Sequence, residues 1–164
     1  MDALSDYAIY MLDDSGHITT WNSGAERLFG PRSWSIGQHF SVLFSPADRA
    51  GGVPQRLLEQ AAAAGDHATE TWRVRNDGTR FRADATLHTI RERDGRIVGF
   101  AEIVRDCTEK VEAARALTDS EHRFRMLVEG VVDYAIYMLD PSGIVTSWNS
   151  GAEHLKGYRS SEII

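Results

Sequence analysis

The 164-residue sequence lacks the marks of several large protein classes. A single cysteine, Cys107, excludes an internal disulfide framework and a multi-cysteine metal site. No apolar run approaches the roughly 18 residues of a membrane-spanning helix, and the first residues lack the basic region and cleavage site of a signal peptide. The net charge is −6 and the basic residues are scattered, which argues against nucleic-acid binding. Together these absences predict a cytoplasmic protein with no nucleic-acid partner and no membrane contact from this chain.

Catalytic motifs are also missing. The sequence has no Ser-His-Asp constellation, no phosphate-binding loop of the G-x-x-x-x-G-K-[ST] type and no zinc-ligand spacing. His122 lies in SEHRFRML, which lacks the pattern around the phosphoacceptor histidine of a kinase, so we expect it on a solvated helix face. This chain is therefore expected not to be an enzyme.

What the sequence does contain is a long internal repeat. Residues 6–30 read DYAIYMLDDSGHITTWNSGAERLFG and residues 133–157 read DYAIYMLDPSGIVTSWNSGAEHLKG, with 19 of 25 positions identical at an offset of 127. That period suits one small domain plus a connector rather than a solenoid unit. We predict a first domain over residues 1–107, a helical connector over 108–130 and the opening part of a second domain over 131–164.

The local patterns of the first domain predict an α+β fold. A long helix is expected over 46–64, since Pro46 follows Ser45 at the first helical position and Gly65 follows its end. Gly-containing turns separate the expected strands. These strands are 8–13, 17–22, 69–75, 80–91 and 96–105. Two strands at the start and three at the end favour one five-stranded antiparallel sheet with the helices on its inner face.

The connector shows a heptad pattern. Apolar positions recur at alternating spacings of three and four, interrupted at Lys110 and Glu121. The pattern predicts a helix over 108–130 that can pair as a coiled coil. A capping box at residues 118–121 would restart the helix, which allows a break near 118. The seam consists of Cys107, Lys110, Ala114, Leu117, Glu121, Phe124, Val128 and Val131.

Three stretches in this order resemble the PAS sensory domain: the doubled DYAIYMLD…SG…WNSGAE…G opening, the WRVRNDGTRF hairpin and the GFAEIVRDCTEK ending. The resemblance covers residues 6–109 in full and residues 133–164 through the first two strands and the first helix. The segment LTDSEHRFRMLVEGVVDYAIY is similar to the helical lead-in of tandem PAS modules in bacterial signalling proteins, which most often end in a histidine kinase and sometimes in a cyclase or phosphodiesterase.

This resemblance implies a signal-transduction module. Such a module relays the binding of a ligand or partner through its linker helix to an output domain, here outside this sequence and most often a histidine kinase of a two-component system. A second interpretation stays open, in which the module is ligand-free and serves only for dimerisation and scaffolding.

The family's sheet order also implies which residues face the ligand cavity. The inward-facing, candidate binding residues are Tyr10, Leu12, Arg73, Phe81, Ala83, Ala85, Leu87, Phe100, Glu102 and Val104. The opposite sheet face then carries Ile9, Met11, Trp72, Ala101 and Ile103, which is too apolar to leave in water. In the family a lead-in helix or a partner subunit covers this face. We therefore expect a homodimer through the linker helix and the outer sheet face.

The ligand itself is not determined by the sequence. Light-oxygen-voltage relatives bond flavin through a Gly-x-Asn-Cys motif, but the matching Gly37-Gln38-His39-Phe40 has phenylalanine at the cysteine position. Covalent flavin chemistry is therefore not expected, while noncovalent binding stays open. Oxygen-sensing relatives ligate haem through a histidine on the long helix, and residues 46–64 contain no histidine, so haem ligated from this helix is not expected either. A small organic ligand could be anchored by Arg73 and Glu102, or these two residues could pair with each other in an empty core.

Overall fold

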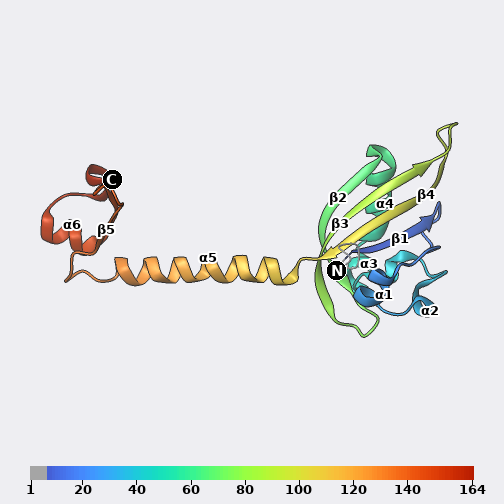
Figure 1. The fold of residues 1–164 in the computed structure, drawn as a ribbon, viewed down its shortest axis with the longest axis horizontal. Coiled ribbons are helices and arrows are strands. Elements are labelled where there is room, and N and C mark those ends of the chain that lie inside the picture. The colour runs from blue at the N-terminus through green and yellow to red at the C-terminus, as the bar shows by residue number, and fades with distance from the viewer. Residues whose placement is uncertain (1–6) are drawn as a thin grey trace. The chain divides into compact units, whose positions relative to one another are not determined.

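The computed structural model describes residues 7–164, in two compact units that meet between Val111 and Glu112. The first unit is an antiparallel sheet in the order β1-β4-β3-β2, with helices on one face (Figure 1). Its strands are β1 (Ala8–Asp13), β2 (Asp66–Val74), β3 (Arg80–Arg91) and β4 (Ile97–Asp106). Its helices are α1 (Ser23–Phe29), α2 (Arg32–Ser35), the 3-10 helix η1 (Phe40–Leu43), α3 (Pro46–Ala50) and α4 (Val53–Ala64). The predicted α+β class and antiparallel sheet are confirmed.

The expectation of five strands is wrong, because this sheet has four. Residues 17–22 run beside β1 and form one isolated bridge with it, between Leu12 and Ile18. The N–H groups of Thr19 and Asn22 donate to the carbonyls of Met11 and Ile9. The N–H groups of Met11 and Ile9 donate to the side-chain oxygens of Thr20 and Asn22, at 2.9 and 3.0 Å. Because the side-chain oxygens of Thr20 and Asn22 replace main-chain carbonyls as acceptors for these two N–H groups, the segment follows β1 without forming a regular ladder.

The helix expected over 46–64 is divided in two. α3 ends at Ala50, and Gly52 adopts the left-handed φ of +69° that glycine accommodates without a steric cost. Pro54 then lies in the first turn of α4, where its missing N–H is not needed. The predicted stop at Gly65 is confirmed, since its N–H donates to the Ala61 carbonyl and closes the helix.

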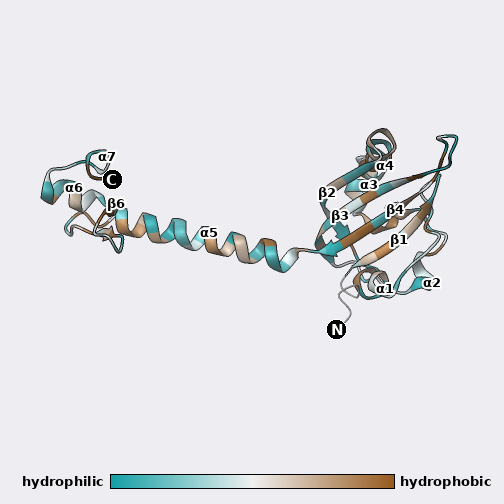
Figure 2. Cartoon of the chain, turned by 45° about the horizontal axis from the view of Figure 1, so that its top comes forward, coloured by the Kyte–Doolittle hydropathy of each residue, from teal (hydrophilic) through white to brown (hydrophobic). Residues whose placement is uncertain are grey.

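The connector forms α5 (Thr108–Glu129), one helix without the break allowed near residue 118. The Thr118 hydroxyl donates to the carbonyl of Ala114 at 3.0 Å, so this side chain sits within the helix and does not cap a new one. Hydrophilic residues alternate with apolar ones along α5 (Figure 2). Within the described residues, no helix is long and apolar enough to cross a membrane.

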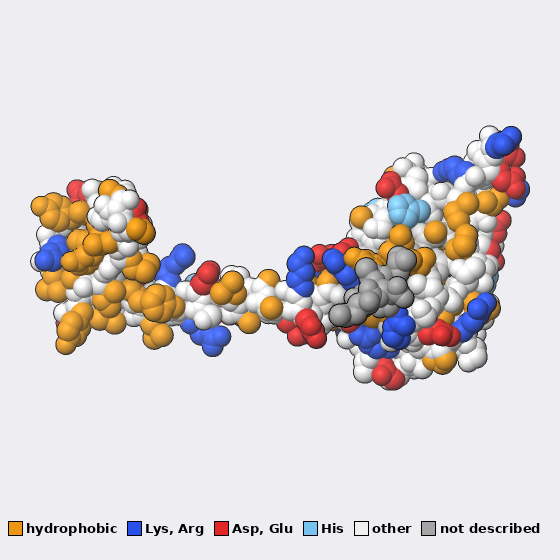
Figure 3. Space-filling model, viewed as in Figure 1, with side chains coloured by type: hydrophobic (Ala, Val, Ile, Leu, Met, Phe, Trp, Pro, Cys, Tyr) orange, Lys and Arg blue, Asp and Glu red, His pale blue; other side chains and the backbone are white. Residues whose placement is uncertain are grey.

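The second unit contains the second copy of the repeat. Its strands β5 (Tyr137–Leu139) and β6 (Val145–Trp148) pair antiparallel and are shorter than the ranges 134–140 and 144–149 that match the first copy. The helices α6 (Ser150–Lys156) and α7 (Ser160–Ile163) follow. Hydrophobic side chains gather over much of this unit's surface (Figure 3).

Candidate functional site

The candidate binding residues lie together in the core of the first unit. Their positions alternate along β1, β2, β3 and β4, so a side-chain period of two puts them on the same sheet face. Each is at most 3% exposed. Burial therefore agrees with the inward orientation predicted for Tyr10, Leu12, Arg73, Phe81, Ala83, Ala85, Leu87, Phe100, Glu102 and Val104. Their part in binding a ligand stays a prediction.

A charged cluster occupies the middle of this core. The Arg73 guanidinium of β2 forms an ion pair with the Glu102 carboxylate of β4, and both side chains are essentially inaccessible to water. The Tyr10 hydroxyl of β1 donates to the other oxygen of Glu102 at 2.5 Å. The Phe44 ring lies 3.7 Å from the Arg73 guanidinium carbon and covers one of its faces. The pairing of Arg73 with Glu102, which the sequence left open, is thus present.

The electrostatics of the cluster favour one protonation state. Burial raises the pKa of the Tyr10 phenol well above its ordinary value, and the nearby negative charge of Glu102 raises it further, while Arg73 opposes the shift. Tyr10 therefore stays a neutral donor. With Arg73 balanced by Glu102, the cluster carries no net charge, which is how buried ionic groups are tolerated.

Hydrogen bonding of the cluster is incomplete. Arg73 Nε and Nη1 have no hydrogen-bond partner among residues 7–164. Neither does the buried hydroxyl of Thr71, which lies two residues earlier on the same face of β2 and opposite Ala83 in the β2–β3 ladder. Thr71 is not among the predicted inward-facing residues, although its position two residues before Arg73 puts it on the same face of β2.

Aromatic side chains close the core around this cluster. Tyr10 contacts Trp21 with ring centroids 5.0 Å apart, and Phe29 links Trp21 to Phe81 at 5.6 and 5.3 Å. The Trp21 indole N–H donates to the carbonyl of Gly30 at 3.0 Å, so its buried polar atom is satisfied. These contacts exclude water from the Arg73–Glu102 pair.

The family's flavin-adduct and haem chemistries do not fit these residues. Phe40, at the position of the adduct-forming cysteine, is fully buried and stacks edge-on with Phe44. Cys107 lies just after β4, where its thiol contacts the carbonyl of Arg82 at 3.3 Å. α4 contains no histidine, and His39 instead caps η1 by accepting the N–H of Ser41. No cluster of three potential metal ligands occurs among residues 7–164.

The end of β4 is tied to the start of α5. Asp106 accepts hydrogen bonds from Arg75 at 2.7 Å and from the N–H of Thr108 at 2.8 Å. Burial opposes ionisation of Asp106, but the bonds from Thr108 and Arg75 outweigh it and lower its pKa. The Cys107 N–H donates to the carbonyl of Arg82 at 2.8 Å. The start of α5 is thus fixed to Arg75, which follows β2, and to Arg82 of β3.

The outer face of the sheet is partly open to solvent. Met11 and Trp72 are each 40% exposed, and the guanidinium groups of Arg80 and Arg82 lie over the Trp72 ring at 5.1 and 5.7 Å. Figure 3 shows hydrophobic side chains among charged ones on this unit. Met11 and Trp72 lie on the two edge strands of the sheet, and Ile9, Ala101 and Ile103 of the same predicted face are half-buried.

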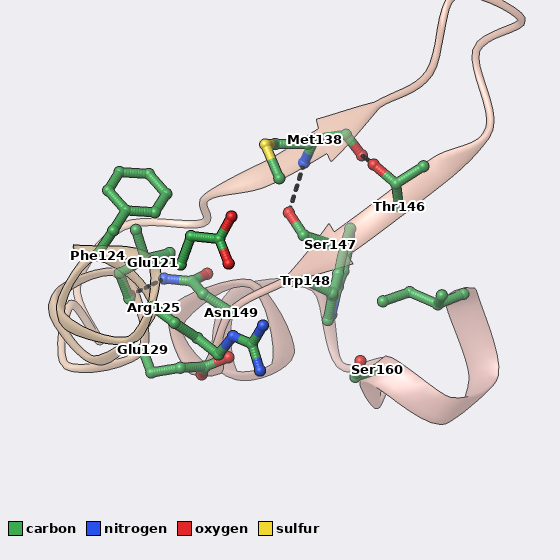
Figure 4. A pocket seen from close by; sticks show the side chains of 12 residues that line it. Glu121, Phe124, Arg125, Glu129, Met138, Thr146, Ser147, Trp148, Asn149 and Ser160 are labelled. Atoms are coloured by element: carbon green, nitrogen blue, oxygen red, sulfur yellow. Dashed lines mark hydrogen bonds between the residues drawn. The ribbon is translucent and has the colours of Figure 1, made fainter. Parts of the chain in front are cut away.

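The second unit has an open pocket of about 600 Å³ (Figure 4). Phe124 and Val128 of α5 line it together with Met138 of β5, the residue equivalent to Met11. The Met138 N–H donates to the Ser147 hydroxyl at 3.1 Å on its wall. In this copy, the last turns of α5 therefore border the same pocket as β5 and β6.

Comparison with known proteins gives a consistent result. The model of the PAS domain family matches residues 6–109. "Two-component system protein A" of Emericella nidulans is 47% identical over 114 residues, which cover 69% of this chain and 17% of the relative. The chain spans about a sixth of the length of the curated relatives it matches.

Solved structures agree with this result. A PAS domain crystal structure from Colwellia psychrerythraea has a TM-score of 0.59 and 25% identity, covering 65% of this chain and 92% of that one. The PAS domain of a LuxR-family regulator from Burkholderia thailandensis, solved in complex with ethanol, has the same fold at a TM-score of 0.53 and 21% identity, covering 63% and 90%. The chain belongs to the PAS domain family.

Proposed function

We propose that the first unit is a sensory module that relays the state of its Arg73–Glu102–Tyr10 cluster through β4 into α5, and from there to an output domain elsewhere in the protein. The similarity to a two-component system protein favours a histidine kinase as that output. The chain itself supplies a PAS domain, which is a sensory and not a catalytic module.

The observation that carries this proposal is the position of Glu102. It lies on β4, four residues before Asp106, and only Cys107 separates β4 from α5. β4 is hydrogen-bonded to β1 on one side and to β3 on the other. Because these neighbours oppose sideways displacement of β4, a change in the ion pair of Glu102 would displace the strand along its own axis. Such a displacement of β4 would move Asp106, which is hydrogen-bonded to Arg75 and to the first turn of α5.

A double-mutant cycle tests the relay. Glu102→Gln alters the core pair and Asp106→Asn weakens the contact with α5, and amide exchange in the first turn of α5 is measured for each variant and for the double variant. If the sites are coupled, the two effects on exchange are non-additive. Additive effects would contradict the relay. Glu92→Gln, which removes an exposed carboxylate paired with Arg96 in the β3–β4 hairpin, serves as the control.

A ligand-free scaffolding role is the second candidate. It is supported by the Arg73–Glu102 pair, since the two charges satisfy each other without a ligand. Native mass spectrometry of the purified protein separates the two functions. A bound small molecule supports sensing, whereas a tight dimer free of any bound molecule supports scaffolding.

Dimerisation belongs to both candidates. We propose a homodimer in which α5 pairs with its counterpart or covers the outer sheet face of the partner. Leu117 and Phe124 on α5 are each 62% exposed, and Met11 and Trp72 are open on the sheet. Burial of such groups is favourable by about 25 cal/mol per Å². A monomer by light scattering at high micromolar concentration would contradict this assembly.

A further inference from the structure

A histidine holds the short helix that precedes the aromatic cover of Arg73. His39 lies directly before η1, and its ring nitrogen Nδ1 accepts the N–H of Ser41 at 3.3 Å. An imidazole nitrogen accepts a hydrogen bond only while it carries no proton, so this bond requires neutral His39 with its proton on Nε2. Protonation turns Nδ1 into a donor and removes the cap of η1.

The turn of η1 connects this cap to the core. Phe40 and Leu43 within η1 are fully buried. Phe44 follows them, and its N–H donates to the carbonyl of Ser41 at 3.1 Å. The Phe44 ring in turn lies 3.7 Å from the guanidinium carbon of Arg73. The path from the cap to Arg73 therefore consists of the two hydrogen bonds of Ser41 and one ring contact.

A second histidine faces His39 across a short antiparallel contact. His17 and His39 form an isolated bridge, which is flanked on both sides by main-chain hydrogen bonds of 2.9 Å. The two residues are therefore a non-hydrogen-bonded pair, the kind in which opposite side chains come closest. Their ring centroids lie 5.5 Å apart. Two positively charged imidazolium rings in this position would repel each other.

Few charged groups surround this pair of rings. The Asp13 carboxylate lies 3.5 Å from Nδ1 of His17, while Leu58 of α4 and Phe40 of η1 border the His39 ring without charge. Burial lowers the pKa of His39, the charge of His17 lowers it further, and Asp13 opposes the shift. His39 is only half-buried, so protons from solvent reach it.

We propose that His39 is a proton-binding site through which the first unit senses acidification. Protonation breaks the bond from Ser41, loosens η1 and withdraws the Phe44 ring from Arg73, which changes the surroundings of the pair with Glu102. The inference rests on the proposed function, since it names the signal that reaches this pair. Because the folded protein favours neutral His39, stabilisation by the cap is complete above a pH of about 6.5 and is lost as the pH falls through the lower folded value.

Nuclear magnetic resonance between about pH 5 and 8 tests the proposal. The ring signals of His39 report its protonation, the Ser41 amide reports the cap, and the Nε–H of Arg73 reports the core. We expect all three signals to change with one midpoint, below a pH of about 6.5. His39→Asn keeps a side-chain acceptor for the Ser41 N–H that takes up no proton, so the Arg73 signal should stay constant over the same range.

His88→Asn is the matched control. His88 follows the inward-facing Leu87 on β3 and so lies on the other sheet face, and this variant should respond to pH as the parent does. His17→Asn removes the facing charge and should raise the midpoint of His39 by up to about half a pH unit. An Arg73 signal that does not follow His39, or that still changes with pH in His39→Asn, would overturn the proposal. If Arg73 follows His39 but the double-mutant cycle is additive, the relay alone is contradicted.

Discussion

The two copies of the repeat make the same local hydrogen bonds. Asn22 accepts the N–H groups of Ile9 and Ala25, and Asn149 accepts those of Ile136 and Ala152, all between 2.7 and 3.0 Å. Asp13 and Asp140 close their hairpin turns through the same pair of backbone N–H groups. The aromatic pairs Tyr10–Trp21 and Tyr137–Trp148 have centroids 5.0 and 5.3 Å apart.

Burial is where the copies differ. Tyr10 and Leu12 are 0% and 2% exposed, whereas Tyr137 and Leu139 are 45% and 54% exposed. In the first copy, β4 pairs with β1 and the helices cover its inner face; in the second, β5 pairs only with β6. Local sequence therefore determines the hydrogen bonds of the repeat, and distant partners determine whether it forms a core.

Gly24 and Gly151 offer the strongest test of this comparison. A β-carbon at Gly24 would lie 1.9 Å from the Tyr7 carbonyl oxygen, and one at Gly151 would lie 2.1 Å from that of Tyr134. Gly24→Ala should destabilise the first unit by more than about 3 kcal/mol, because backbone must move within a packed core. Gly151→Ala should raise amide exchange only around α6. Equal effects of both variants on the melting of the first unit would contradict this account.

Replacing the paired asparagines should have the next largest effect. Asn22→Ala removes the cap of α1 and the bonds to Ile9 and Tyr7, for a loss of about 2 to 3 kcal/mol in the free energy of unfolding. Asn149→Ala should leave the denaturation midpoint of the first unit unchanged and speed exchange at Ile136. Urea denaturation followed by tryptophan fluorescence measures the first effect. A shift of the first unit's midpoint in Asn149→Ala would show that the copies are not independent.

Removing one tyrosine hydroxyl should produce a smaller difference in stability between the two copies. Tyr10→Phe leaves an oxygen of the buried Glu102 unpaired and should cost about 2 kcal/mol, whereas Tyr137→Phe should change stability by less than about 0.5 kcal/mol. The raised pKa of Tyr10 means that its contribution is complete below pH of about 10 and is lost as the pH rises further. Tyr10→Phe should therefore flatten the alkaline fall in stability, measured by melting at several pH values. If stability falls as steeply with rising pH in Tyr10→Phe as in the parent, another titrating group causes the fall.

The smallest effect is expected at Asp106. Its lowered pKa means that its contribution is present above the ordinary value of about 4 and is lost as the pH falls through the lower folded value. Because the side chain is about a third exposed, Asp106→Asn should cost no more than about 1 kcal/mol at neutral pH. The variant should also lose less stability on acidification than the parent. An unchanged acid profile would mean that other carboxylates account for it.

Much of the fold followed from sequence because the patterns were local. Alternation along β3 placed Phe81 on one face of the strand, the sheet order implied by the PAS resemblance turned Phe81 and Glu102 inward, and glycines such as Gly65 marked where elements end. The failures arose where side chains compete with the backbone. The side chains of Thr20 and Asn22 accept hydrogen bonds from β1 in place of main-chain carbonyls, and the Thr118 hydroxyl donates within its own helix. The periodicity of apolar residues does not predict such hydrogen bonds.

The candidate site was predictable only in part. Arg73 and Glu102 stood out as charges at inward positions, but the contact of Phe44 with Arg73 joins an irregular segment to β2 and depends on the tertiary fold. The only sequence feature that indicated an inward-facing Thr71 was its spacing of two residues from Arg73. The assembled core determines which buried polar atoms lack a hydrogen-bond partner. Residue spacing in the sequence does not predict which atoms these are.

The most direct test of the central claim compares amide exchange in α5 between Tyr10→Phe and Tyr137→Phe. If the buried cluster is coupled to α5 through β4, Tyr10→Phe should speed exchange at Val111, whose N–H bonds to the carbonyl of Cys107 in the first turn. Tyr137→Phe should leave that exchange rate unchanged. Exchange at Val111 that is the same in both variants and in the parent, while the core around Glu102 loosens in Tyr10→Phe, would contradict the claim.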